Sequence, residues 1–297
     1  MPKPIPAPRE EGFTTTTGSP LYWARYGRTS APKLLLLHGG PGADHCYMLP
    51  QMLQLGERFD LLFYDQRGGG RSKSNGRDPI TWRTHVEDLG AVVTEFGLEP
   101  LSMVGYSWGA MLALLYTIEQ RENPHLVPPA RLALMSPAPL TSDYRRAFES
   151  EFNRRQQAPG IHELRDKLAG SGLREKDPAG YRQRAFELSV AGYFADPGKA
   201  RDLTPFRVVG KVQQSVWESL GNFDLISDLE GIRTPSIVIH GRDDPIPLAS
   251  SVEAARAIGT NLVVLDDCGH VPYVEQPKQL FSALDTFLDE TNPSERS

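Results

Sequence analysis

Ser107, Asp244 and His270 are three residues whose types can together perform nucleophilic catalysis, and each comes shortly after an apolar run of the chain. A serine hydroxyl is a weak nucleophile at neutral pH, so a base must take its proton while it attacks a carbonyl carbon. Histidine suits that task because its pKa lies near neutral pH, and a carboxylate can orient the imidazole and stabilise its cation. We therefore predict that Ser107 is the nucleophile, His270 its base and Asp244 the acid of a catalytic triad.

Two adjacent aspartates compete for the third position of this triad. Asp243 and Asp244 both follow the apolar run that ends before Gly241. The Gly-x-x-Asp spacing from Gly241 favours Asp244, and it leaves Asp243 as a hydrogen-bonding loop residue or as part of the electrostatics of the site. Asp266 and Asp267 belong to the loop of the histidine itself, and they lie too near along that loop to face the ring readily.

Ser107 stands in the middle of Gly105-Tyr106-Ser107-Trp108-Gly109, between an apolar run at 101–104 and a run of small and apolar residues at 111–118. This order predicts a strand, a very tight turn and a helix, with the serine at the turn. A nucleophile on such a strained turn leaves no room for side chains two positions to either side, which explains both glycines. The pentapeptide alone is weak evidence. The residues that follow the other strands make the catalytic interpretation specific.

Attack on a carbonyl carbon creates an oxyanion, which needs backbone N–H groups that already point at it. Trp108, at the start of the helix after the serine, would supply one donor. The second is expected from the loop His38-Gly39-Gly40-Pro41-Gly42, and we predict Gly40 because a residue without Cβ can bring its N–H close. His38 is interpreted as structural, with a ring that braces this loop through hydrogen bonds.

The elements that must position these residues alternate between buried strands and helices. Continuous apolar runs are typical of strands covered on both faces of a sheet, and they occur at 34–37, 60–65, 101–104, 131–136, 235–240 and 261–265. Helical segments separate them, at 49–55, 84–96, 111–118, 248–258 and 278–288, and an antiparallel hairpin is expected within 12–26. This alternation of strands and helices predicts an α/β fold with a doubly wound, mostly parallel sheet. The functional loops of such a sheet lie at the carboxyl ends of the strands.

The alternation stops between residues 138 and 230, where no buried-strand run occurs. Charged amphipathic segments take its place, at 144–157, 161–168, 178–190 and 206–220. We therefore predict a sheet domain formed by residues 1–137 and 231–297, interrupted by an all-helical cap at 138–230. The first eight residues include four prolines, which predicts a mobile or extended arm over 1–11.

Composition and charge exclude several other classes of protein. The chain has 297 residues, 39% hydrophobic and 23% charged, and its formal net charge of −5 argues against a nucleic-acid or anionic-membrane partner. No apolar stretch is long enough to span a membrane and no signal-peptide pattern occurs, so a cytoplasmic location is expected. Cys46 and Cys268 are too few for a disulfide framework and lack metal-type spacing. We expect no cofactor and no metal, and a small peptide or small acyl compound as substrate.

Four motifs of the sheet domain together resemble those of the prolyl iminopeptidase (proline aminopeptidase) branch of the α/β-hydrolases. They are His38-Gly39-Gly40-Pro41-Gly42, Asp65-Gln66-Arg67-Gly68-Gly69-Gly70-Arg71-Ser72, Gly105-Tyr106-Ser107-Trp108-Gly109 and Gly241-Arg242-Asp243-Asp244. The first two are distinctive, because most esterases lack that pair. The resemblance implies the α/β-hydrolase fold and a serine exopeptidase that releases an N-terminal residue, often proline, from peptides. The resemblance also implies that Ser107, Asp244 and His270 are the catalytic residues and that Gly40 and Trp108 are the oxyanion donors.

An aminopeptidase also needs carboxylates that hold the ammonium group of its substrate, and the resemblance implies that these come largely from the cap. Glu218 is the first candidate and Glu187 the second. The chain departs from the family in three places. It has Tyr106 where the elbow often has glycine, Ala110 where a further glycine or serine is common, and Pro245 where some members carry an acid directly after the catalytic aspartate.

Two other functions are alternatives to an aminopeptidase. A carboxylesterase, lactonase or amide hydrolase of the same fold would keep these motifs and bind a neutral acyl group. A non-catalytic binding protein of this fold is opposed by the complete set of catalytic residues, and the serine at position 107 excludes the aspartate nucleophile of haloalkane dehalogenases and epoxide hydrolases. Cys268 is interpreted as a small buried side chain, although a bulky thiol reagent on it would crowd His270.

Overall fold

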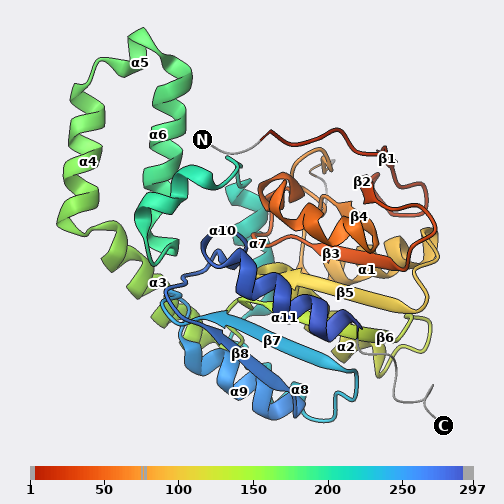
Figure 1. Cartoon of the computed structure of the whole chain (residues 1–297). Helices are drawn as coiled ribbons and strands as arrows, with labels where there is room; N and C mark the ends of the chain where they lie inside the picture. Colours follow the sequence, from red (N-terminus) through yellow and green to blue (C-terminus); the bar gives the residue numbers. More distant parts are fainter. Residues whose placement is uncertain (1–3, 75, 77–78, 290–297) are drawn as a thin grey trace.

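An eight-stranded sheet runs through the middle of the molecule, with helices on both of its faces (Figure 1). The computed structural model describes residues 4–74, 76 and 79–289. The strands lie in the order β1-β2-β4-β3-β5-β6-β7-β8. Their bounds are β1 (Glu10–Phe13), β2 (Tyr22–Gly27), β3 (Lys33–Leu37), β4 (Asp60–Tyr64), β5 (Leu101–Tyr106), β6 (Pro129–Met135), β7 (Ser236–Gly241) and β8 (Asn261–Leu265). In this sheet the pairs β1–β2 and β2–β4 are antiparallel and the other five pairs are parallel, so the predicted mostly parallel α/β sheet is confirmed.

The central strand β3 shows why the sequence reads as continuous apolar runs. Its side chains from Leu34 to Leu37 are at most 1% exposed. Successive side chains of a strand point to opposite faces, so Leu35 and Leu37 belong to one hydrophobic core while Leu34 and Leu36 belong to the other. Because neither face meets water, neither needs polar residues.

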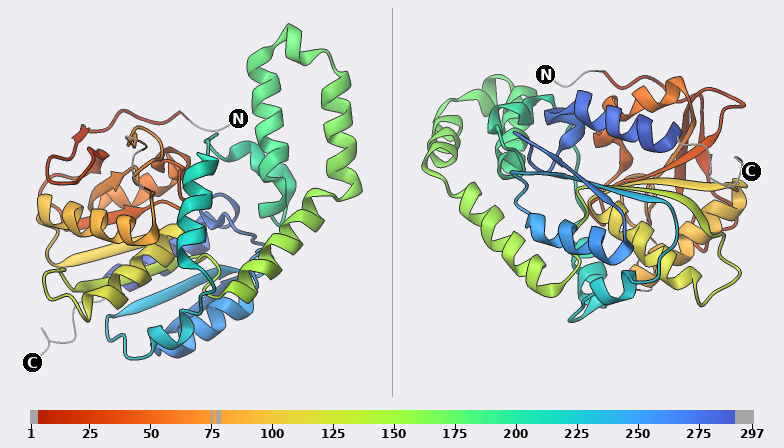
Figure 2. Two further views of the ribbon diagram at one scale, coloured as in Figure 1. Left: turned by 180° about the vertical axis from the view of Figure 1, so that it is seen from behind. Right: turned by 60° about the horizontal axis from the view of Figure 1, so that its bottom comes forward.

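Helices cover the two cores on opposite sides of the sheet (Figure 2). The core that contains Leu35 is covered by α1 (Trp82–Glu95), α2 (Trp108–Gln120) and α9 (Leu248–Ile258). The other is covered by α10 (Pro272–Glu275), α11 (Pro277–Asp289) and two 3-10 helices, His45–Met48 and Gln51–Glu57. The segment 49–55, predicted as helical, therefore lies mostly in the second of these 3-10 helices.

Helices also occupy the chain between β6 and β7, within the range predicted for the cap. They are α3 (Ser142–Gln156), α4 (Pro159–Gly170), α5 (Leu173–Lys176), α6 (Pro178–Val190), α7 (Gly210–Leu220) and α8 (Ile226–Leu229), with 3-10 helices at Ala191–Tyr193 and Pro197–Asp202. A hairpin of α4 and α6 projects away from the sheet (Figures 1 and 2). In contrast, α7 packs on the sheet domain, where the Val209 N–H donates a 3.0 Å hydrogen bond to Gly42 O. Among the described residues, no helix has the length and apolarity needed to cross a membrane.

The predicted N-terminal arm over 1–11 covers three kinds of residue. Residues 1–3 lie outside the described part of the chain, residues 4–9 belong to no helix or strand, and residues 10 and 11 belong to β1. Just before that strand, Arg9 donates hydrogen bonds of 2.8 Å to Gly27 O and to Asp60 Oδ1. These bonds attach the residue before β1 to the strands β2 and β4.

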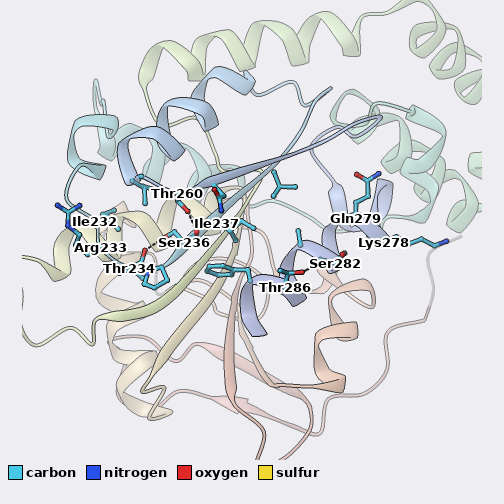
Figure 3. A pocket seen from close by; sticks show the side chains of 17 residues that line it. Ile232, Arg233, Thr234, Ser236, Ile237, Thr260, Lys278, Gln279, Ser282 and Thr286 are labelled. Carbon is cyan, nitrogen blue, oxygen red and sulfur yellow. Dashed lines mark hydrogen bonds between the residues drawn. The ribbon is translucent and has the colours of Figure 1, made fainter. Parts of the chain in front are cut away.

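A cleft of about 1000 Å³ opens at the amino ends of β7 and β8, beside α11 (Figure 3). Thr234, Thr260 and Ser282 are among the residues that line it. Ser107 follows the carboxyl end of β5, which runs parallel to these strands. The cleft therefore lies at the opposite edge of the sheet from the residues with predicted catalytic roles.

Candidate active site

Ser107 lies on a strained turn between β5 and α2. Its φ of 54° and ψ of −118° place a non-glycine residue in a conformation that side chains rarely adopt. A Cβ on Gly105 would lie 2.6 Å from the Ala110 Cα, and Gly109 is similarly crowded by the end of β3. The glycines two positions to either side thus let the helix pack directly on the strand. The turn holds the Ser107 hydroxyl out at the carboxyl edge of the sheet.

The structure brings Ser107, His270 and Asp244 together, although up to 163 residues separate them in the chain. The Ser107 Oγ lies 3.0 Å from His270 Nε2, and His270 Nδ1 lies 2.8 Å from Asp244 Oδ2. His270 is 5% exposed and Asp244 7%. This is the arrangement in which an imidazole can accept the hydroxyl proton while a carboxylate stabilises its cation.

Asp244 is held in its ionised form. Burial alone would raise the pKa of its carboxyl group, but electrostatic interactions with His270 and His240 and hydrogen bonds from His270 and the Ile246 N–H outweigh burial and lower it. The Ile246 bond reaches Asp244 Oδ1 at 2.8 Å. A carboxylate with a lowered pKa keeps its charge at neutral pH and so can stabilise an imidazolium beside it.

The neighbouring aspartates point elsewhere. Asp243 is exposed, and its hydrogen bonds to described residues use backbone atoms: its N–H donates to Cys268 O, and its carbonyl accepts from Arg155 Nη1. The carboxylate of Asp266 pairs with Arg242. Of the candidates considered from the sequence, Asp244 is therefore the one that faces His270.

The glycine loop after β3 passes directly over the nucleophile. A Cβ on Gly39 would lie 2.7 Å from the Ser107 Cβ, and the Gly39 N–H is already used, because it donates to Tyr47 Oη at 2.6 Å. Gly40 has a φ of 61°, which favours glycine. Among the hydrogen bonds within the described residues, none uses the N–H of Gly40 or of Trp108. Both predicted oxyanion donors are thus unoccupied beside Ser107.

A buried network of hydrogen bonds fixes this loop. His38 is fully buried, and its Nδ1 contacts Gly39 O at 2.8 Å while its Nε2 accepts from the Gln66 N–H at 3.0 Å. Burial lowers the pKa of His38, so the ring is held neutral. The Gln66 side chain donates to His38 O and accepts from Trp108 Nε1. The bracing role predicted for His38 is confirmed. Gln66 was missed, although it lies two residues after β4, in a glycine-rich motif.

A cavity of about 350 Å³ is lined mainly by residues of α3 and α7. Two aromatic side chains of its wall contact the site: Trp217 packs on Trp108 with ring centroids 5.4 Å apart, and Tyr193 stacks on His270 at 5.3 Å. The remaining wall consists of aromatic and polar residues, one proline and one glycine: Pro139, Arg145, Phe148, Glu149, Phe152, Asn153, Gly210, Gln213 and Gln214. It contains one carboxylate, that of Glu149, which pairs with Arg145 at 2.9 Å. The Arg145 guanidinium also lies 4.3 Å from the centre of the Trp217 ring.

The acids predicted to bind an ammonium group are not in this cavity. Glu218 is exposed one turn beyond Gln214 on α7, and it accepts a 2.7 Å hydrogen bond from the Gln214 side chain. Glu187 on α6 bonds to Gln183 and Arg184 and lines a different cleft. The reason is geometric: the residues that face the cavity depend on how the inserted helices are turned against the sheet.

The remaining site predictions concern Cys268 and metal binding. Cys268 is fully buried and its Sγ contacts Gly269 O at 3.5 Å. Burial raises the pKa of this thiol, so a reagent that needs an accessible thiolate would not modify it in the folded protein. Within the described residues, no group of three or more His, Cys, Asp or Glu side chains is arranged to hold a metal ion.

The known proteins that are similar to this chain share one fold but include enzymes with different reactions. A family model described as "Alpha/beta hydrolase family" matches residues 34–284. The proline iminopeptidase of Heyndrickxia coagulans is 23% identical over 292 residues, which cover 94% of this chain and 98% of the relative, and that of Lactobacillus helveticus is 26% identical over 291 residues, covering 94% and 98%. The crystal structure of a proline iminopeptidase-related protein from Thermus thermophilus has a TM-score of 0.70, 22% identity and coverage of 94% and 96%. That of the enol-lactonase from Burkholderia xenovorans has a TM-score of 0.66, 21% identity and coverage of 94% and 100%.

Proposed function

The chain belongs to the α/β-hydrolase family, and from this premise we propose that it is a serine hydrolase acting as an aminopeptidase, which releases N-terminal proline or other small residues from peptides. The hydrolase proposal depends above all on the hydrogen-bonded triad of Ser107, His270 and Asp244. The Ser107 Oγ lies 3.0 Å from His270 Nε2, and His270 Nδ1 lies 2.8 Å from Asp244 Oδ2. Distant similarity to proline iminopeptidases over nearly the whole chain supports the aminopeptidase.

The proposed reaction proceeds in two halves. In the first, Ser107 Oγ attacks the carbonyl carbon, His270 Nε2 takes its proton, and the N–H groups of Gly40 and Trp108 bind the oxyanion. The tetrahedral intermediate then breaks its C–N bond, and His270 gives the proton to the leaving amine. In the second half, His270 takes a proton from a water molecule, whose oxygen attacks the carbonyl carbon of the Ser107 ester. The C–O bond to Ser107 then breaks, His270 returns the proton to Ser107 Oγ, and the N-terminal residue leaves with a free carboxyl group.

The cavity between α3 and α7 is the proposed site for the N-terminal residue. Its volume of about 350 Å³ fits one small residue, and Phe148, Tyr193 and Trp217 offer flat surfaces to a pyrrolidine ring. Glu149 would bind the substrate ammonium, because a carboxylate and an ammonium form a charge-assisted hydrogen bond. Glu149 therefore replaces Glu218 and Glu187 as our candidate for this role. It is paired with Arg145 in the present arrangement, so binding would require the ammonium to share or displace that partner.

Arg145 favours a second candidate function. Its guanidinium is oriented by Glu149 and by the face of Trp217, and a guanidinium binds carboxylates well. An esterase or lactonase whose substrate carries a carboxylate would use the same cavity with Arg145 as its anchor. The two candidates thus assign the binding role to opposite members of one ion pair.

A substrate panel separates the two candidates. Prolyl and alanyl arylamides would be compared with p-nitrophenyl esters and with lactones that carry a carboxylate, using Ser107→Ala as the inactive control. We expect arylamide hydrolysis by the unmodified protein, with KM raised in Glu149→Gln. Cleavage of esters and lactones alone, with KM raised in Arg145→Gln, would replace the aminopeptidase by the second candidate. Full activity of Ser107→Ala on every substrate would contradict both.

A further inference from the structure

A second buried carboxylate, that of Glu275, lies where the helical insertion meets the loop of His270. Glu275 ends α10, which lies beside the insertion (Figure 1), and it is 3% exposed. Its Oε2 accepts the Gly269 N–H at 2.8 Å, and its Oε1 accepts the N–H groups of Ala195 at 2.8 Å and Asp196 at 3.4 Å. We call these three bonds the Glu275 bridge. One carboxylate thereby connects two backbone segments that are far apart in the chain.

The carboxylate has backbone donors and no cationic side chain as hydrogen-bond partner among the described residues. Lys199 lies nearby, but its Nζ donates to the backbone carbonyl of Glu275, at 2.9 Å. Burying a carboxylate is costly unless its oxygens are hydrogen-bonded. Here burial raises the pKa of Glu275 in spite of the three N–H groups and the Lys199 charge, which act to lower it. The folded protein thus holds this charge at a cost to its stability.

Both segments joined by the bridge bear directly on His270. Gly269 precedes the histidine, and the His270 N–H itself donates to Tyr193 O at 2.7 Å. Tyr193 comes two residues before Ala195, and its ring stacks on the imidazole with an interplanar angle of 29°. The segments are in close contact, because a Cβ on Gly269 would lie 2.8 Å from the Ala195 N. The imidazole is therefore held between its own loop and a segment of the insertion.

We propose that Glu275 is a positioning residue for His270, which couples the helical insertion to the catalytic base. The bridge fixes the backbone before the histidine and, at the same time, the segment that carries the Tyr193 ring. The distance from His270 Nε2 to Ser107 Oγ then depends on Glu275, which touches neither atom. This inference rests on the proposed role of His270 as the base for Ser107.

Two substitutions test the bridge from its two ends. Glu275→Gln keeps the shape of the side chain but turns an N–H donor toward backbone N–H groups. Ala195→Pro removes a donor on the insertion side, and Phe194 before it, with φ −97° and ψ 146°, already has the extended conformation that a residue before proline favours. Asp60→Asn is the matched control: Asp60 is another buried carboxylate, 6% exposed and paired with Arg9, at the amino end of β4.

The readouts must separate positioning from general stability. One is the rate at which a fluorophosphonate probe labels Ser107, since this reaction needs the serine and its base but no particular substrate. The second is the far-downfield proton NMR signal of the hydrogen between His270 Nδ1 and Asp244. The third is the Tm, which shows whether a variant is labelled slowly because it is less stable. Glu275→Gln avoids the cost of the buried charge but leaves a backbone N–H group without its acceptor, so we expect a Tm near that of the unmodified protein.

We expect labelling to fall about 100-fold in Glu275→Gln and Ala195→Pro, the scale of a 1 Å misplacement, with a shifted or broadened downfield signal. Asp60→Asn should lower the Tm and leave labelling unchanged. Labelling at the rate of the unmodified protein in both bridge variants, with an unchanged downfield signal, would overturn the inference. If the unmodified protein is not labelled at all, the proposed hydrolase function is contradicted. The role of the Glu275 bridge is then judged from the downfield signal, which should still differ between the unmodified protein and the two bridge variants.

Discussion

The indole N–H of Trp108 donates a 2.9 Å hydrogen bond to the side-chain oxygen of Gln66, and both groups are buried. The amide nitrogen of Gln66 donates in turn to His38 O at 2.7 Å. One side chain therefore spans the helix start and the glycine loop, which carry the two proposed oxyanion donors. The relative position of these donors depends on a residue that cannot reach the oxyanion itself.

Replacing Gln66 should weaken catalysis more than substrate binding. Without the amide, the Trp108 and Gly40 N–H groups lose their common support, so kcat should fall about 100-fold in Gln66→Leu, with little change in KM. Trp108→Phe keeps the backbone donor and removes only the indole N–H, and it should lower kcat less. Because both substitutions break the same bond, the loss in the double variant should be smaller than the product of the two single losses. Independent, multiplicative losses would show that the two side chains are not coupled.

Asp244→Asn and Asp243→Asn form a matched pair of substitutions. Of these two aspartates, Asp244 is the one that contacts His270 Nδ1, so Asp244→Asn should lower kcat by about 10⁴-fold, the loss expected when an amide replaces the carboxylate that orients the base. Asp243 has an exposed side chain, and Asp243→Asn should retain nearly full activity. Steady-state kinetics on whichever substrate the panel identifies would measure both. Equal losses in the two variants would mean that the aspartates share the role.

The residues that follow sheet strands could be assigned from the sequence, because the fold dictates where strand ends meet. Ser107, Asp244 and His270 each follow a parallel strand, and parallel strands end at one edge of the sheet. The glycines at positions 105 and 109 marked the tight turn in the same way, since a side chain there would collide with the neighbouring helix or strand. Local sequence and global topology agree at these positions.

The residues of the insertion could not be assigned in this way. The helix α3 carries several acids, and only the packing of α3 and α7 against the sheet decides that Glu149 faces the cavity and Glu151 pairs with Arg154 and Arg155 instead. Glu275 was also missed, because its partners are backbone N–H groups of Gly269, Ala195 and Asp196. Such groups leave no signal in the residue types of the sequence.

Glu149→Gln and Glu218→Gln distinguish the acid in the cavity from the one predicted from the sequence. If Glu149 binds the substrate ammonium, its loss should raise KM for aminoacyl arylamides about 10-fold, the effect of one hydrogen bond to a charged group at a half-exposed site. N-acetylated arylamides lack the charge and should show no change. Glu218 lies outside the cavity, so Glu218→Gln should behave like the unmodified protein. A raised KM in Glu218→Gln alone would restore the original prediction.

Because of Asp65, the stability of the protein should depend on pH in the acid range. It is 1% exposed, contacts His45 Nδ1 at 2.7 Å and accepts the Arg71 N–H at 2.9 Å. Burial acts to raise the pKa of this carboxyl, but the hydrogen bond and electrostatic interaction with His45 and the hydrogen bond from the Arg71 N–H outweigh burial, and the pKa is lowered. A carboxyl whose pKa is lower in the folded than in the unfolded state stabilises the fold above its unfolded pKa of about 4.

This stabilisation must disappear as the pH falls from about 4 towards the lower pKa of the folded state. The amide in Asp65→Asn stays neutral at every pH, so this variant lacks the stabilisation that the Asp65 carboxylate provides. At pH 7 its free energy of unfolding should be about 1–3 kcal/mol lower than that of the unmodified protein, as expected for a damaged buried hydrogen-bond site. The gap should narrow as the pH is lowered below about 4, because the unmodified protein then loses the same contribution. Urea unfolding at pH 7, 5, 4 and 3 measures the gap directly. A gap of constant size at all four pH values would show that the Asp65 charge does not contribute to stability.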